Sequence, residues 1–273
     1  MTERHHDLAW GALGLAVLAL GWTAVNRISG PFVLPSIPDT VAALGHILVS
    51  GHVGPALVVT LGHAVGGALL GAIFGFGLGL LGGFQRPAGA ALAPVATAIL
   101  GVPPIAWIVL AFLWFGTGLV APLFTVAVTA SPIVFAATLQ GVRARDPALA
   151  EMAAVFRLPP RTRLLRLTLP GLAVHVAPGL STAFAISWKV ALTAEVLGDG
   201  SGIGGHFATA RAHLDLAEAM AWVVLVVIVL LVADALLLGP LRRWIAGVRG
   251  ATRDGASPSA PTCAGVAALK EGR

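Results

Sequence analysis

Charged residues and cysteine are both scarce in this chain of 273 residues. Charged side chains make up 11% of it, whereas soluble domains contain about 25%. Hydrophobic residues make up 57%, and the mean hydropathy is +0.91. This composition excludes an ordinary soluble domain and predicts a membrane protein. Cys263 is the single cysteine, which excludes an intrachain disulfide and a cysteine metal cluster.

Sequence motifs for nucleotide and metal chemistry are also missing. There is no Gly-x4-Gly-Lys-Ser/Thr phosphate loop and no His-Glu-x2-His pair. The eight histidines are scattered; His206 and His213 share one expected loop, which is too little to predict a metal site. We therefore expect no enzyme activity, no metal site and no cofactor in this chain. If ATP drives its function, ATP and Mg²⁺ must be bound by a separate subunit.

Apolar stretches dominate the chain and predict an all-α, polytopic fold with six transmembrane helices. The expected spans cover residues 8–25, 56–84, 88–115, 120–140, 171–197 and 216–238 of a membrane domain over 1–249, followed by a disordered tail over 250–273. The first span lacks a small-residue cleavage site, so we expect it to be retained. A short amphipathic helix over 41–49, capped by Asp39 and Thr40, and an outer loop over 198–215 are expected between spans.

Basic residues are concentrated in the segments that alternate spans place on one side of the membrane. With the N-terminus inside, that side holds Arg4, Arg86, six arginines within 143–166 and the basic tail, against Arg27 and Arg211 outside. This asymmetry predicts that both termini are cytoplasmic. Because the basic residues cluster in loops between apolar runs, as membrane topology predicts, the net charge of +5 does not indicate nucleic acid, and membrane lipid is the expected partner instead.

Glycines recur at every fourth position of the second expected span. The series is Gly67, Gly71, Gly75, Gly79 and Gly83. Residues four apart share one helix face, so the series predicts a bare groove where another helix packs closely.

Five residues in the third and fifth expected spans are candidates for a substrate path. Pro103 and Pro104 interrupt the third span, which frees backbone carbonyls and favours either a cavity near Trp107 or a simple kink. Lys189 lies in the outer half of the fifth span, where burying its charge would cost about 2.5–3.5 kcal/mol. It is either an anion-attracting residue in the path or a snorkelling or structural lysine. Glu195 lies about 240° further around that helix, so a direct pair with Lys189 is not expected.

The longest polar interruption covers residues 143–170 and contains six arginines. Asp146 and Pro147 form a helix start, because an N-cap acceptor precedes a proline at the first helical position. Pro159 and Pro160 end this helix after residue 156 and open a second one that reaches Leu169. The segment is expected to be a helix–turn–helix that docks a soluble partner, or else an ordinary basic cytoplasmic loop.

Residues within this segment resemble the "EAA" loop of ABC importer permeases, which reads Glu-Ala-Ala, three residues, Gly, nine residues, an aliphatic, any residue, Leu-Pro. The matching positions are Glu151, Ala153, Leu167, Leu169 and Pro170. Two positions depart from the pattern. Met152 replaces the first alanine, and Arg157 stands where a glycine normally permits the turn between the helices. The residues at 158–160 could make the turn in its place.

Further segments resemble the nitrate/sulfonate/taurine branch of these permeases. They are 103–107, 114–118, 188–190, 194–195 and 202–204. The resemblance implies a translocation subunit in the bacterial inner membrane that works as a homodimer with a cytoplasmic ATP-binding subunit and an extracytoplasmic substrate-binding protein. It also implies that the ATPase is contacted by Glu151, Ala153, Arg157, Arg161, Arg163, Leu169 and Pro170.

The substrate implied by this resemblance is a small anion such as a sulfonate, taurine or nitrate. Relatives that carry a pyrimidine vitamin precursor keep a second substrate class open. Two other functions also stay open: a secondary transporter that needs no ATPase, and a membrane scaffold that binds a soluble partner. A secondary transporter would favour inverted repeats, and the sequence shows none.

Overall fold

The computed structural model describes residues 2–145, 147–163, 169–198 and 200–233, and within these ranges no strand occurs. Its helices are α1 (Thr2–Ser29), α2 (Ile37–Val49), α3 (Val53–Phe84), α4 (Arg86–Gly101), α5 (Pro104–Phe115), α6 (Val120–Arg143), α7 (Pro147–Val155), α8 (Pro160–Arg163), α9 (Leu169–Leu197), α10 (Gly202–Ala212) and α11 (Leu216–Ala233). The all-α prediction is therefore confirmed for the described residues. The expected tail over 250–273 lies outside them.

Four helical segments are long and apolar enough to cross a membrane: α3, α6, the stretch Gly171–Ala212 and α11. The bent pair of α4 and α5 would make a fifth span. These segments make the chain a multi-pass membrane protein. The expected first span lies within α1, which is not among them, so a count of six stays a prediction.

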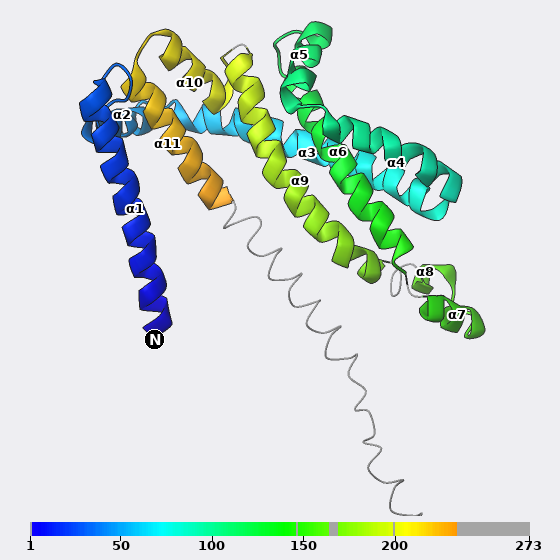
Figure 1. The fold of residues 1–273 in the computed structure, drawn as a ribbon. Helices are drawn as coiled ribbons and strands as arrows, with labels where there is room; N and C mark the ends of the chain where they lie inside the picture. The colour runs from blue at the N-terminus through cyan, green and yellow to red at the C-terminus, as the bar shows by residue number, and fades with distance from the viewer. Residues whose placement is uncertain (1, 146, 164–168, 199, 234–273) are drawn as a thin grey trace, which may run out of the picture.

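Helices α3, α6 and α9 form the centre of the bundle (Figure 1). The glycine face predicted for α3 lies directly on α6. A Cβ added at Gly67 would come within 2.5 Å of Val126, and one at Gly79 within 2.6 Å of Thr138. Gly75 is tighter still, because its Cβ would overlap the carbonyl oxygen of Ser131. The close packing predicted from the glycine series is confirmed, and it brings the two backbones together.

The expected break at Pro103 and Pro104 is present and sharp. Helix α4 ends at Gly101 and α5 begins at Pro104, and the two axes differ by 94°. Neither proline has a main-chain N–H to continue the helix, and residues before a proline avoid the helical conformation. The expected span over 88–115 is thus two helices that meet at a corner.

Two short helices near one end of the bundle differ from the prediction. Helix α2 starts at Ile37 with Ser36 as its N-cap, whose hydroxyl oxygen accepts a hydrogen bond from the Asp39 N–H at 3.2 Å. The expected cap at Asp39 and Thr40 was therefore wrong by one turn. The expected outer loop over 198–215 was also wrong, because it contains the helix α10.

The remaining helices lie near the ends of α6 and α9 or apart from them. Figure 1 shows α7 and α8 at the end of α6 opposite to α5. It shows α10 near the end of α9 that lies away from α7 and α8. Helix α1 stands apart from this bundle and approaches α2. Two side chains of α1 fix the linker between them: the Trp22 indole N–H donates to the Pro35 carbonyl at 2.8 Å, and the Asn26 amide donates to the Leu34 carbonyl at 2.6 Å.

Candidate functional site

The arginine-rich segment after α6 forms the two short helices expected of it. Helix α7 begins at Pro147 and ends at Val155, and α8 begins at Pro160. Both prolines occupy the first helical position, where the missing N–H costs no hydrogen bond. The described part of the second helix ends at Arg163, so its expected continuation to Leu169 lies outside the described residues.

The turn between α7 and α8 is made at Arg157. This residue has a φ of 48°, in the left-handed region where glycine is favoured. The N–H of Leu158 donates to the carbonyl of Ala153 at 3.0 Å, and the N–H of Phe156 donates to Met152 at 3.0 Å. A bond spanning five residues around a left-handed residue is a Schellman C-cap. The turn therefore lies in the register of the glycine position, rather than in the three residues after it.

The described side chains of α7, and of Phe156 just after it, include the buried Ala153 and an exposed rim. Ala153 is 2% exposed, whereas Val155 and Phe156 are 78% and 72% exposed. Glu151, Met152, Arg157 and Arg161 are also exposed. The structure therefore brings Glu151, Arg157 and Arg161 to one end of the bundle, next to exposed apolar side chains. Arg163 lies in α8, and Leu169 and Pro170 lie at the start of α9.

The residues expected to line a path are distributed over two regions. Pro103 and Pro104 are exposed at the corner between α4 and α5, and Trp107 follows on α5 with its indole N–H buried and without a partner among the described residues. Lys189 is exposed on α9 and lines a cavity of about 240 Å³ against α11. The cavity is otherwise apolar: Phe184, Ala185, Trp188, Leu230, Leu231 and Ala233 line it.

Glu195 lies in a buried polar cluster that joins three helices. Its Oε2 accepts hydrogen bonds from the Thr60 hydroxyl at 2.8 Å and from the Gly204 N–H at 3.0 Å. Its Oε1 lies 2.8 Å from Nδ1 of His63. The Thr60 oxygen in turn accepts from the Ile203 N–H at 2.9 Å. Glu195 and His63 are each 1% exposed, and Thr60 is fully buried.

This cluster explains where Glu195 points. As expected it does not pair with Lys189; it faces α3 and α10, whereas Lys189 faces the cavity against α11. Sequence reasoning missed Thr60 and His63 as its partners. The available signal was that two polar residues three positions apart share one face of an otherwise apolar span.

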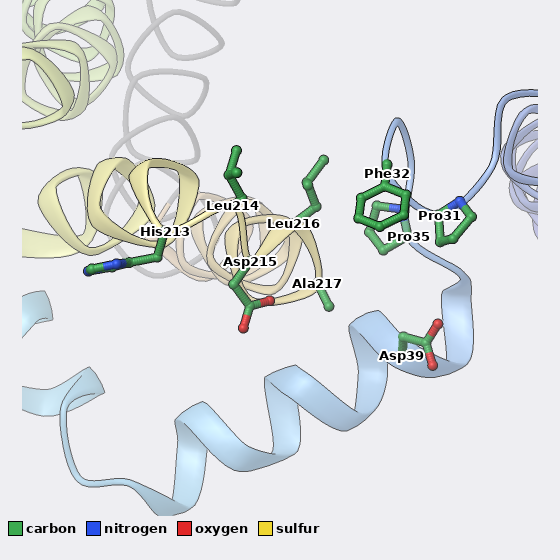
Figure 2. A pocket seen from close by; sticks show the side chains of 9 residues that line it. All are labelled: Pro31, Phe32, Pro35, Asp39, His213, Leu214, Asp215, Leu216 and Ala217. Carbon is green, nitrogen blue, oxygen red and sulfur yellow. The ribbon is translucent and has the colours of Figure 1, made fainter.

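An open cleft of about 390 Å³ lies near α2, α10 and α11. Figure 2 shows Pro31, Phe32 and Pro35 of the α1–α2 linker on one side of it, and residues 213–217, which form the α10–α11 turn and the start of α11, on the other. Its two carboxylates are tied to helix starts. The Ser36 hydroxyl donates to Asp39 in the first turn of α2, and Asp215 accepts from the Glu218 N–H at 2.9 Å at the start of α11.

Residues 75–245 match the family described as "Binding-protein-dependent transport system inner membrane component". The putative aliphatic sulfonates transport permease protein SsuC of Bacillus subtilis is 27% identical over 239 residues, which cover 86% of this chain and 87% of that protein. The nitrate import permease protein NrtB of Leptolyngbya laminosa is 30% identical over 148 residues, 54% of this chain and 53% of that protein. The bicarbonate transport system permease protein CmpB of Synechococcus elongatus is 28% identical over the same shares.

Two solved structures share the fold. An amino acid ABC transporter crystallised with histidines superposes with a TM-score of 0.57 at 16% identity, covering 74% of this chain and 97% of that one. An inward-facing MetNI methionine ABC transporter gives a TM-score of 0.54 at 14% identity, covering 69% and 94%. At these identities the likeness extends to the fold alone.

Proposed function

Because this chain belongs to the family of binding-protein-dependent transport inner membrane components, as an ABC importer permease of the nitrate and sulfonate branch, we propose that it forms an ATP-driven path for a small anion. The path crosses the bacterial inner membrane in six spans, with both termini in the cytoplasm. The positive-inside asymmetry of the sequence supports this orientation.

The single observation that carries the coupling proposal is the exposed rim of α7. Val155 and Phe156 are more than two-thirds exposed next to the acid Glu151. An apolar patch rimmed by charges is typical of a protein-binding surface. A cytoplasmic ATPase subunit, which holds ATP and Mg²⁺, covers this rim. Arg157, Arg161 and Arg163 meet acidic groups of the ATPase or lipid headgroups, while Ala153, Leu169 and Pro170 hold the two helices in position.

Lys189 supports an anion as the substrate. It places a positive charge beside an apolar cavity at membrane depth, where the low dielectric strengthens its attraction for an anion. A small sulfonate combines a charged head with an apolar body and fits such surroundings. Taurine also has a sulfonate group, and nitrate and bicarbonate are themselves small anions. Pro103, Pro104 and Trp107 contribute a second wall of the path at the corner of α5.

A second copy of the chain completes the path. Helix α5 exposes Ile105, Val109 and Leu113 at 53%, 59% and 78%, and their spacing of four residues places them on one helix face. This stripe packs against the other copy, whereas lipid covers the remaining apolar surface. On the outer side, an extracytoplasmic binding protein docks at the cleft of Figure 2 and delivers the solute.

The proposal is tested by reconstituting the chain with its ATPase in liposomes and measuring uptake of radiolabelled taurine, nitrate and bicarbonate. Uptake is expected only when ATP, the ATPase and the cognate binding protein are all present. Uptake by the chain alone, driven by a gradient, would show a secondary transporter instead. A parallel titration of the binding protein with these anions and with a pyrimidine vitamin precursor separates the two substrate classes.

A further inference from the structure

Helix α10 begins in a glycine-rich turn that leaves room for a group from another helix. Gly200 and Gly202 both have positive φ angles, 86° and 71°. A Cβ added at Gly202 would overlap the Glu195 carboxyl group, and one at Gly204 would come within 2.7 Å of the Glu195 Cβ. The turn is therefore shaped around the Glu195 side chain, and larger residues at these two positions would displace it.

Two of the three hydrogen bonds at the Glu195 carboxyl group bring a donor to it whichever ring nitrogen of His63 carries the proton. The Thr60 oxygen accepts from the Ile203 N–H, so the Thr60 proton is directed to Oε2 of Glu195. The Gly204 N–H donates to the same oxygen. His63 completes the set when its Nδ1 carries the proton. An ionised carboxylate, which only accepts hydrogen bonds, matches this arrangement.

The position of the carboxylate is that of an anion bound at a helix start. The first N–H groups of a helix have no partner within the helix and attract negative charge. In α10 two of them, from Ile203 and Gly204, are bound by Thr60 and Glu195 of other helices. A fully buried carboxylate that lost these donors would be left without compensation.

We propose that Glu195 is a positioning residue, whose carboxylate acts as a built-in anion at the N-terminus of α10 and, with Thr60 and His63, fastens α10 to α3 and α9. The three helices then move as one unit. Because α10 leads directly into residues 213–217, the turn and first residues of α11 that line the outer cleft, this buried cluster sets the shape of that cleft. The fastening itself does not depend on the proposed transport function.

Amide hydrogen exchange tests the fastening without substrate or ATP. In the intact permease–ATPase complex, peptides covering residues 200–206 are expected to exchange slowly. Glu195→Ala should accelerate exchange at Ile203 and Gly204 while peptides around Gly75 remain protected. Sodium formate, a carboxylate small enough for the emptied site, should restore part of the protection, whereas sodium chloride at equal ionic strength should not.

Conservative and matched variants complete the experiment. Glu195→Gln is expected to lose less protection, because its amide oxygen still accepts from Gly204 and its NH₂ group can donate to the other His63 tautomer. Thr60→Val should expose the Ile203 amide to exchange. Thr125→Val is its control, because Thr125 is equally buried but donates only to the Ala121 carbonyl of its own helix.

The proposal is overturned if Glu195→Ala leaves exchange at residues 203 and 204 unchanged, or if Thr60→Val and Thr125→Val affect them equally. Loss of protection throughout the protein, without rescue by formate, would reduce Glu195 to a general folding residue and would also overturn it. Should Glu195→Ala fail to accumulate, hydrogen exchange in Glu195→Gln and the comparison of Thr60→Val with Thr125→Val test the proposal in its place. None of these outcomes bears on whether the chain transports an anion.

Discussion

The main-chain N–H of Leu158 donates to the carbonyl of Ala153 across a turn in which Arg157 is left-handed. A left-handed conformation costs a residue with a side chain about 1–2 kcal/mol, and glycine loses roughly 0.5–1 kcal/mol through its extra unfolded-state freedom. Arg157→Gly should therefore stabilise the protein by about 0.5–1 kcal/mol. A small rise in the melting temperature of the purified permease would show it.

The control for this substitution is Arg161→Gly, because Arg161 lies within α8 and gains nothing from a glycine. The same test can be repeated independently at Leu214. It has a φ of 60°, and the following N–H of Asp215 donates to Ala210 at 3.0 Å in the same C-cap arrangement. If Arg157→Gly and Leu214→Gly both lower the melting temperature, the strain assigned to these turns does not exist.

The contact between α3 and α6 predicts opposite effects for two glycines of one helix. At Gly75 an added methyl group would overlap the Ser131 carbonyl, so Gly75→Ala should force the helices apart at a cost of about 1–3 kcal/mol. At Gly77 nothing lies within 4 Å of the added Cβ, so Gly77→Ala should be neutral or mildly stabilising. Thermal denaturation of the two variants compares them directly; equal melting temperatures would contradict the close contact.

Charge reversal at Glu151 tests the coupling surface. Glu151→Lys should leave the protein inserted in the membrane and abolish co-purification of the ATPase, because a like charge would then face a partner surface suited to an acid. Arg211→Glu is the control, since Arg211 is an exposed charge on α10, far from α7. Unchanged co-purification and uptake in Glu151→Lys would remove Glu151 from the interface.

Lys189 is expected to govern the anion preference of the path. Lys189→Ala should lower ATP-driven uptake of taurine or nitrate about tenfold, the effect of roughly 1.4 kcal/mol of lost attraction, and Lys189→Arg should keep most of it. Thr193→Ala, one turn further on and also exposed, should be near wild type. If Lys189→Ala and Thr193→Ala transport equally well, the lysine serves the membrane interface instead.

Local patterns of the sequence predicted those parts of the fold that local chemistry controls. Successive glycines of the α3 series lie one turn apart, and the corner at Pro103 and Pro104 and the helix start at Pro147 each depend on neighbouring residues. The helix α10 was missed because its glycines also favour a loop, and the contacts that hold α10 come from elsewhere in the chain.

The candidate site likewise has one part that follows from local sequence and one that depends on residues far apart in the chain. The turn at Arg157 occupies the register of a sequence pattern, although the pattern itself called for glycine. The partners of Glu195 lie 132 and 135 positions earlier in the chain. The pattern within α3 marks Thr60 and His63 as polar residues on one face, but it does not identify Glu195 as their partner. That pairing follows only from the packing of α3 against α9.

The seam between α3 and α6 repeats on both sides. The glycines of α3 and the residues they meet on α6 both recur every four positions, as Val126, Ala130, Val134, Thr138 and Val142 do. Sliding one helix by about 6 Å would therefore present nearly the same surfaces again, so the seam alone does not select a single register. A further contact must therefore fix the register of α3 against α6, and Arg145 supplies one at the end of the interface. Its guanidinium lies 4.6 Å from the centroid of the Phe84 ring, while its Nε donates to the Val142 carbonyl at 2.8 Å.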